Sequence, residues 1–337
     1  MGGGESPICL GAKVIRAKLS VLIGKIVFNG ARHSGEHPRK FWKGLTMPSA
    51  TITFYSCEEC GFDVDSGTGY YCESCDHWNC DDCGSCRAHD DDARIHVWNY
   101  RPRNFRPKGN YPSEPLLGVE LEICGRESAI VSAVDRIDDS EDHLYLKEDG
   151  SIHGVEIVTH PMTLAWARKF PFARLLEDMK RSGCLVDDGY GLHIHVSRNA
   201  FQRDGKQSAS HQMLWLLFMY RNVSELEKLA RRTSTRWAAF KKPDPGELAR
   251  KAQAVSCDDR YVAVNCNNKN TFELRFFKST LEEREFYAAL EFADASVRYT
   301  RGLAIQDVVR GKAIGWRHFT TWARRHNYRN LLAEISE

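Results

Sequence analysis

One short stretch, residues 189–197, constrains the fold more than any other part of the chain. It reads Gly-Tyr-Gly-Leu-His-Ile-His-Val-Ser, so apolar and polar residues alternate after the second glycine. Side chains of a strand point alternately to its two faces, which places His193 and His195 together and the aliphatic residues opposite them. The two glycines predict a preceding turn with positive φ. Taken alone, the pattern also fits a half-exposed strand that carries two histidines by chance.

The same design recurs in three other segments, each of which alternates apolar with charged residues. Unpaired carboxylates this close together would repel one another, and divalent cations remove that repulsion. Carboxylates with one or two imidazoles suit Mg²⁺ or Mn²⁺ better than a structural Zn²⁺. We therefore expect one sheet whose polar face is a metal site. The charged residues are Glu120 and Glu122 in segment 117–124, Glu156 in segment 154–158, and Glu273 with Arg275 in segment 272–276.

Composition limits the class of protein. The chain has 337 residues, which suggests two or three domains, and 42% of them are hydrophobic, enough to form real cores. A net charge of only +2 provides no basic field for nucleic acid. No stretch is long enough to cross a membrane. Cysteines outside one cluster are scattered, so we expect a reducing, cytoplasmic setting. The sequence leaves the oligomeric state open.

Seven of the twelve cysteines lie between residues 57 and 86 and include three Cys-x-x-Cys pairs, a spacing typical of zinc sites. Three pairs exceed what one tetrahedral ion needs, so we infer two Zn²⁺ ions within residues 51–98. Metal–thiolate bonds would supply the folding energy of so small a module. Its acidic composition disfavours nucleic acid. Two roles stay open for it: a structural staple, or a module that binds a positively charged peptide.

The remaining segments complete the expected organisation. Residues 1–50 have no readable pattern, and residues 99–115 form a linker rich in proline and arginine. Residues 116–303 form the main α+β domain. Its strands include a hairpin made of 260–265, a turn at 267–270 and the strand that carries Glu273. The tail, residues 304–337, predicts one or two packing helices. Helices of the main domain are expected at 129–137, at 164–182 with a break near Pro171, at 207–232, from 244, and at 281–301.

These motifs, in this order, resemble a known family. The family is that of the amidoligases of the carboxylate–amine ligase superfamily, to which glutamine synthetase and glutamate–cysteine ligase are related. The resemblance covers roughly residues 116–301 and implies a curved, mostly antiparallel sheet flanked by helices, with metals and nucleotide on its concave face. The similar motifs are Glu120-x-Glu122, Lys147-Glu-Asp-Gly-Ser151 with Glu156, Gly191-x-His193-x-His195, and Glu273-x-Arg275.

The family resemblance also implies roles for single residues. One Mg²⁺ or Mn²⁺ ion would bind Glu122 and Glu156, with Asp149 or Asp187 as candidates for a third acidic ligand. A second ion would bind Glu120, His193 and Glu273. His195 would contact phosphate, and Ser197 would lie near the nucleotide. Arg275 would neutralise charge on the transferring phosphoryl group, and Arg260 would assist it.

Residues 57–98 resemble ZZ-type and related cross-brace zinc fingers, in which alternate ligand pairs share an ion. The resemblance assigns Cys57, Cys60, Cys80 and Cys83 to one Zn²⁺. It assigns Cys72, Cys75, His89 and His96 to the other, with Cys86 and His77 as spare candidates.

The implied activity is ATP-dependent formation of an amide or peptide bond through an acyl phosphate, on a carboxylate and an amine. The zinc module could recruit a peptide or protein as substrate. The chain has no Walker-type phosphate loop, so metal ions and arginine would have to hold ATP. Two other functions stay open: a binding protein with an inactive ligase domain, and a metal-dependent hydrolase that uses the same carboxylates. ATP dependence distinguishes the ligase from the hydrolase.

Overall fold

A computed structural model of the protein describes most of residues 94–336, and strand segments alone within residues 55–80. The expected segment 1–50, the start of the helix from 244, and Arg260 lie outside the described residues. Within 94–336 the gaps are 112–113, 151, 204–205, 234–237, 242–249, 253–261, 304–305, 307 and 309–312.

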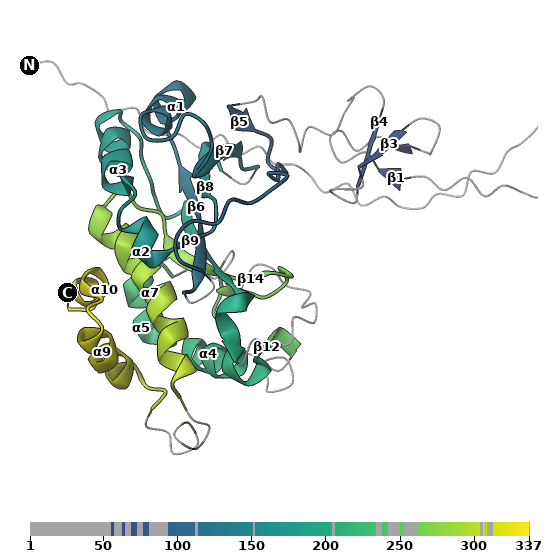
Figure 1. The fold of residues 1–337 in the computed structure, drawn as a ribbon. Coiled ribbons are helices and arrows are strands. Elements are labelled where there is room, and N and C mark those ends of the chain that lie inside the picture. Colours follow the sequence, from purple (N-terminus) through teal and green to yellow (C-terminus); the bar gives the residue numbers. More distant parts are fainter. Residues whose placement is uncertain are drawn as a thin grey trace, which may run out of the picture. The chain divides into compact units, whose positions relative to one another are not determined.

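The main domain is built on a mixed, mostly antiparallel, open sheet (Figure 1). Among its described strands every pairing is antiparallel except that of β5 (Ile95–His96) with β7 (Leu144–Glu148). A short strand, β9 (Met162–Thr163), also pairs with β6. The four alternating segments lie side by side, as predicted. In spatial order the strands are β13 (Val264–Asn265), β14 (Thr271–Lys278), β10 (Gly191–Ser197), β6 (Leu116–Ile123), β8 (Val155–Thr159), β7 (Leu144–Glu148) and β5 (Ile95–His96).

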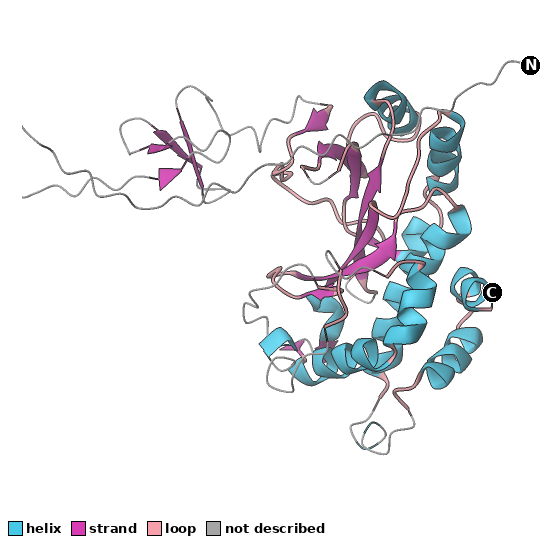
Figure 2. Cartoon of the chain, turned by 180° about the vertical axis from the view of Figure 1, so that it is seen from behind, coloured by secondary structure: helices cyan, strands magenta, loops and turns pink. Residues whose placement is uncertain are grey.

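Helices cover the apolar face of the sheet, which confirms the predicted α+β class (Figures 1 and 2). The central one, α7 (Glu283–Arg301), packs on β10 and β6, and α5 packs on β14. The alternate residues of β6, β10 and β14 that face these helices are almost fully buried, as their hydrophobicity requires. The other helices are α1 (Glu127–Asp135), α2 (Leu164–Ala167), α3 (Phe172–Arg181), α4 (Ala209–Arg221), α5 (Val223–Ala230), α9 (Trp316–Arg325) and α10 (Arg329–Ile335).

Two of the segments predicted to be helical are divided. The break predicted near Pro171 separates α2 from α3, because proline cannot donate the hydrogen bond that a continuous helix needs. The segment 207–232, predicted as one helix, divides at Asn222, which is buried. The Asn222 side-chain amide donates to the carbonyl of Phe218 at 2.7 Å and to that of Ile314 at 3.0 Å. Thus the break between α4 and α5 is stabilised by a contact with a segment far away in the sequence.

Within the expected zinc module the structure describes two small antiparallel sheets. Strand β1 (Tyr55–Ser56) pairs with β2 (Asp63–Val64), and β3 (Gly69–Cys72) pairs with β4 (His77–Cys80). Tyr55 stacks on Trp78 with ring centroids 4.7 Å apart, and Tyr71 packs on Trp78 at 5.4 Å. No helix in the described part of the chain is long and apolar enough to span a bilayer.

One buried carboxylate holds three helices together. Glu291 of α7 is 1% exposed. Its Oε1 accepts hydrogen bonds from Arg168 Nη2 and Asn330 Nδ2, both at 2.9 Å. Its Oε2 accepts one from the backbone N–H of Leu331 at 2.9 Å. A single side chain on α7 thereby fixes the end of α2 and the start of α10.

We predict that Glu291→Ala lowers the free energy of unfolding by about 1–3 kcal/mol, because it leaves buried donors without an acceptor. Urea denaturation measures the change. The matched control is Glu283→Ala on the exposed first turn of the same helix, which should change stability by less than about 0.5 kcal/mol. Equal effects of the two substitutions would show that the Glu291 contacts are not structural.

Candidate functional site

The register of the strands gathers the predicted site residues on the face of the sheet opposite the helices. Directly opposed residues of an antiparallel pair point to the same face. We name six of these residues, Glu120, Glu122, Glu156, His193, His195 and Glu273, the carboxylate–histidine cluster. The opposed pairs are Glu120 with His193, His195 with Glu273, Glu122 with Glu156, and Glu156 with Lys147 of β7.

Arg275 lies on this face at a bulge in β14. After Leu274, two residues of β14, Arg275 and Phe276, take the place of one in β10. The extra residue allows Phe276 and Phe277 both to be buried in the core, with ring centroids 4.5 Å apart. Alternation places Arg275 on the same face as Glu273, and its Nη1 donates to Oε1 of Glu273.

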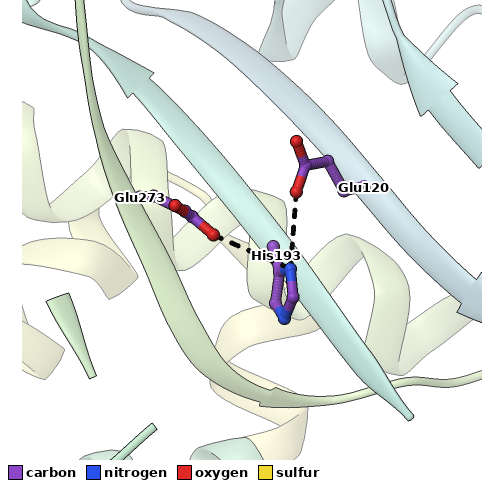
Figure 3. A group of neighbouring side chains, drawn as sticks. All are labelled: Glu120, His193 and Glu273. Atoms are coloured by element: carbon purple, nitrogen blue, oxygen red, sulfur yellow. Dashed lines mark hydrogen bonds and ion pairs between the residues drawn. The ribbon is translucent and has the colours of Figure 1, made fainter. Parts of the chain in front are cut away.

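His193 lies at the centre of the cluster and is 4% exposed. Figure 3 shows its ring between Glu120 and Glu273. Its Nδ1 is 3.4 Å from Oε2 of Glu120 and 3.7 Å from Oε1 of Glu273. Its Nε2 is 3.6 Å from Oε1 of Glu122. The two ring nitrogens therefore face different carboxylates.

Two sets of three side chains could hold a metal ion, and the ligand atoms of each set lie within 4.8 Å of one another. One set is Glu120, His193 and Glu273; the other is Glu122, Glu156 and His193. The structure thus brings together all five residues that were expected to bind the two divalent ions. His193 belongs to both sets, although it was expected at one ion only. A neutral imidazole has a single free lone pair, so His193 can ligate one ion at a time. Neither set includes Asp149 or Asp187.

Gly191 supports the cluster in a way that differs from the prediction. The expected positive φ at Gly189 and Gly191 is wrong: the described glycines with positive φ are Gly109 and Gly183. A Cβ at Gly191 would instead lie 2.5 Å from Nε2 of His193, so this position needs glycine for space. Its backbone N–H donates to Oε2 of Glu122 at 2.5 Å and orients that carboxylate.

Two asparagines orient Glu273 and were not predicted as site residues. Oε2 of Glu273 accepts from Asn265 Nδ2 at 2.8 Å and from Asn268 Nδ2 at 3.3 Å. Hydrogen bonds of this kind fix a carboxylate whose other oxygen is turned to a ligand. The predicted hairpin, confirmed in shorter form as β13 and β14, was the signal that could have placed them here.

The phosphate-binding candidates lie further along the face. His195 Nε2 is 3.1 Å from Oε1 of Glu120, and its Nδ1 is 3.1 Å from Oγ1 of Thr271. Ser197 ends β10, and its hydroxyl accepts from the backbone N–H of Asn199 at 3.3 Å. Ser197 therefore caps the next turn of chain in the structure, and its contact with a nucleotide stays a prediction.

Protons balance the charge of the cluster. Its four carboxylates face two fixed cations, Lys147, whose Nζ is 2.8 Å from Oε2 of Glu156, and Arg275. Burial lowers the pKa of His195, but the carboxylates of Glu120, Glu273 and Glu156 together outweigh burial and raise this pKa to about 9. Burial also lowers the pKa of His193, but Glu120, Glu122 and Glu273 together outweigh it, so this pKa is raised as well. The His195 imidazole therefore supplies positive charge near neutral pH.

The carboxylates divide into two kinds. Burial, with the nearby charge of Glu120, raises the pKa of Glu156 to about 8, and burial raises the pKa of Glu122. Burial acts in the same sense on Glu120 and Glu273, but His195 and the other positive groups nearby together outweigh burial and hold both pKa values below their usual range. Without a metal ion, the Glu156 end of the cluster is thus the part that retains a proton.

The predicted zinc ligands are only partly described. Cys72 ends β3, and Cys80 ends β4, the strand that also contains His77. His96 lies in β5 of the main sheet and is fully buried. Its Nε2 is 3.0 Å from Oε2 of Glu141, and its ring stacks on Tyr100 with centroids 3.5 Å apart. The two zinc sites stay a prediction, because Cys57, Cys60, Cys75, Cys83, Cys86 and His89 lie outside the described residues.

Comparison with known proteins adds no assignment: no protein-family model matches the chain, and no curated protein matches it. The function is therefore argued from the chemistry of the carboxylate–histidine cluster.

We predict that Mg²⁺ or Mn²⁺ binding releases protons, since His195 and Glu156 hold them in the metal-free cluster. Calorimetry at pH 7.5 in buffers of different ionisation enthalpy measures the release, and affinity should rise from pH 6.5 to pH 9. Glu148→Gln, an exposed substitution on β7, is the control. A binding heat that is the same in every buffer would contradict the prediction.

Stability of the metal-free protein should fall over the same pH range. A raised histidine pKa stabilises the fold below about pH 6.5, and that contribution is lost as pH rises towards the folded value of about 9. Glu156 adds to the loss, because ionising it in the fold is unfavourable up to about pH 8. Thermal unfolding in EDTA should thus give a lower Tm at pH 9 than at pH 6.5, with a larger gain from Mg²⁺ at pH 9. A Tm that rises with pH in EDTA would show that these groups do not control stability.

Proposed function

We propose that the carboxylate–histidine cluster binds two divalent cations and is the active site of an ATP-dependent carboxylate–amine ligase. The observation that carries the proposal is the pair of metal-ligand sets on one face of the sheet, joined at His193. Carboxylates with imidazole are a donor set suited to Mg²⁺ or Mn²⁺. Bound there, the ions would supply positive charge that stabilises the phosphate oxygens of ATP.

A purely structural ion network is the competing account of the same residues, and one buried atom argues against it. Nε of Arg275 has no hydrogen-bond partner within the described part of the structure. Buried polar atoms normally find partners, and the exceptions need an explanation. Arg275 is the residue assigned to the phosphoryl group, so an oxyanion is the partner that we propose.

The reaction follows from the poor reactivity of carboxylates towards amines. The carboxylate oxygen of the acid attacks the γ-phosphorus of ATP, the bond from that phosphorus to the β–γ bridging oxygen breaks, and ADP leaves. The amine nitrogen then attacks the acyl carbon of the acyl phosphate, phosphate leaves with its oxygen, and the amine loses a proton. Arg275 would stabilise the charge on the transferring phosphoryl group, and His195 would donate to a phosphate oxygen. Arg260 is proposed to assist Arg275, and Ser197 to lie near the nucleotide.

We predict amine-dependent release of ADP when the protein is incubated with ATP, Mg²⁺ and pools of amino acids, polyamines and peptides. Glu122→Gln removes one ligand oxygen and a charge. It should lower the rate by about 100-fold or more, because even partners of metal ligands contribute about 10–100-fold. Glu148→Gln is the matched control on the same sheet and should retain the rate of the native protein.

The outcomes separate the three functions. ADP release that requires an amine supports the ligase. Metal-dependent bond cleavage without ATP supports the hydrolase instead. Absence of ATP binding by calorimetry, with Mg²⁺ and Mn²⁺ both tried, would contradict any ligase activity and favour a binding protein.

We also propose that residues 51–98 bind two Zn²⁺ ions, on the strength of their Cys-x-x-Cys pairs. Elemental analysis of the purified protein should give two zinc ions per chain. Cys80→Ser should lower the number of zinc ions per chain. Cys266→Ser, which replaces a buried cysteine directly after β13, is the control and should leave the number unchanged. Zinc-free protein that is fully folded would contradict the proposal.

A further inference from the structure

Arg232 lies on the polar face of the sheet, at the end of the cluster that contains Glu122. The chain reaches it from α5 through Arg231, which has a positive φ of 53°. A Cβ built on Gly191 would lie 3.1 Å from Nη1 of Arg232 and 2.5 Å from Nε2 of His193. The guanidinium and the imidazole therefore face the same small space above Gly191.

The two consecutive arginines differ in their partners. Arg231 makes ion pairs with Glu285 at 3.1 Å and Glu334 at 2.9 Å. Arg232 makes no ion pair within 4.0 Å with any described residue, and its one hydrogen bond there is a long one of 3.5 Å to the carbonyl of Phe277. A guanidinium has five N–H donors, so most of those of Arg232 remain for a ligand.

The acidic groups around Arg232 are engaged elsewhere. Glu122 accepts from the Gly191 N–H. Asp187 accepts from the Gly189 N–H at 2.6 Å. Asp188 pairs with Lys278 at 2.7 Å. Arg232 is thus a partly buried cation beside a metal-ligand set, and no carboxylate of the described residues lies within ion-pair distance of it.

We propose that Arg232 binds the carboxylate of the acid substrate and holds it beside the Glu122 end of the cluster. This assignment rests on the proposed ligase activity, which requires an anionic acyl donor near the metal sites. Arginine suits the task because its planar fork donates two parallel hydrogen bonds to a carboxylate. Arg275 is paired with Glu273 and is the arginine proposed for the phosphoryl group, so the two arginines would bind different anions.

Residue-resolved modification with phenylglyoxal tests the inference without any turnover. The full chain is treated alone or with acetate, succinate, L-glutamate, a short peptide with a free carboxyl terminus, or inorganic phosphate, and peptides are quantified by mass spectrometry. We expect Arg232 to react faster than the ion-paired Arg231, and at least one carboxylate probe to protect it. Protection by phosphate alone would overturn the assignment in favour of a phosphate site, and protection by no probe would overturn it outright.

Kinetics then tests the same residue in the reaction. With the acid found by ADP release, Arg232→Met should raise the KM for the acid by about 10-fold or more, the effect of losing a charged hydrogen bond, without changing the KM for ATP. Arg232→Lys should raise the KM for the acid less than Arg232→Met does. The control Arg181→Met, on the exposed end of α3, should keep the KM values of the native protein. An increased KM for ATP would contradict the assignment. If ADP release fails altogether, the protection measurement still decides whether Arg232 binds a carboxylate.

Discussion

Repulsion between four glutamates on one face of a sheet is the constraint on which the rest of the site depends. Glu120 and Glu122 lie on β6, Glu156 lies on its neighbour β8, and Glu273 lies on β14, the next strand but one to β6, so the spacing of the strands sets their separation. Like charges at such distances cannot all be ionised without a counter-charge. In the metal-free protein the counter-charge comes from Lys147, Arg275 and a proton on His195, and a proton on Glu156 removes one negative charge. Those protons occupy the place that we propose for divalent cations.

The scaffold holds this unfavourable arrangement from the other side. The helices bury the apolar residues of the same strands, and the free energy of that burial fixes the register that aligns the glutamates. The bulge in β14 serves both faces, since it fills the core with Phe276 and Phe277 and leaves Arg275 beside Glu273. Polar contacts then set single side chains: Gly191 orients Glu122, and Asn265 orients Glu273. Packing of the core thus sets the positions of the strands, and hydrogen bonds set the orientations of the carboxylates.

The sequence predicted the parts of this account that depend on local periodicity. Strict alternation of apolar and polar residues placed His193 and His195 on one face, and its recurrence predicted that Glu120, Glu122, Glu156 and Glu273 share that face. Contacts between distant segments were not predictable in this way. Arg232 follows a helix and belongs to no motif in the sequence. The space above Gly191 is bounded by His193 and Arg232, which are far apart in the sequence. The division of helices at Asn222 likewise depends on the distant carbonyl of Ile314.

The central claim is that the carboxylate–histidine cluster holds two divalent cations, with His193 ligating one of them. Crystals grown with Mn²⁺ and measured at its absorption edge test this most directly, because anomalous peaks locate each ion. The account predicts two peaks on the polar face of the sheet, one near Glu120 and Glu273 and one near Glu122 and Glu156, with His193 bound to only one ion. A map without peaks at the cluster, from crystals saturated with Mn²⁺, would contradict the account and leave the cluster as a structural ion network.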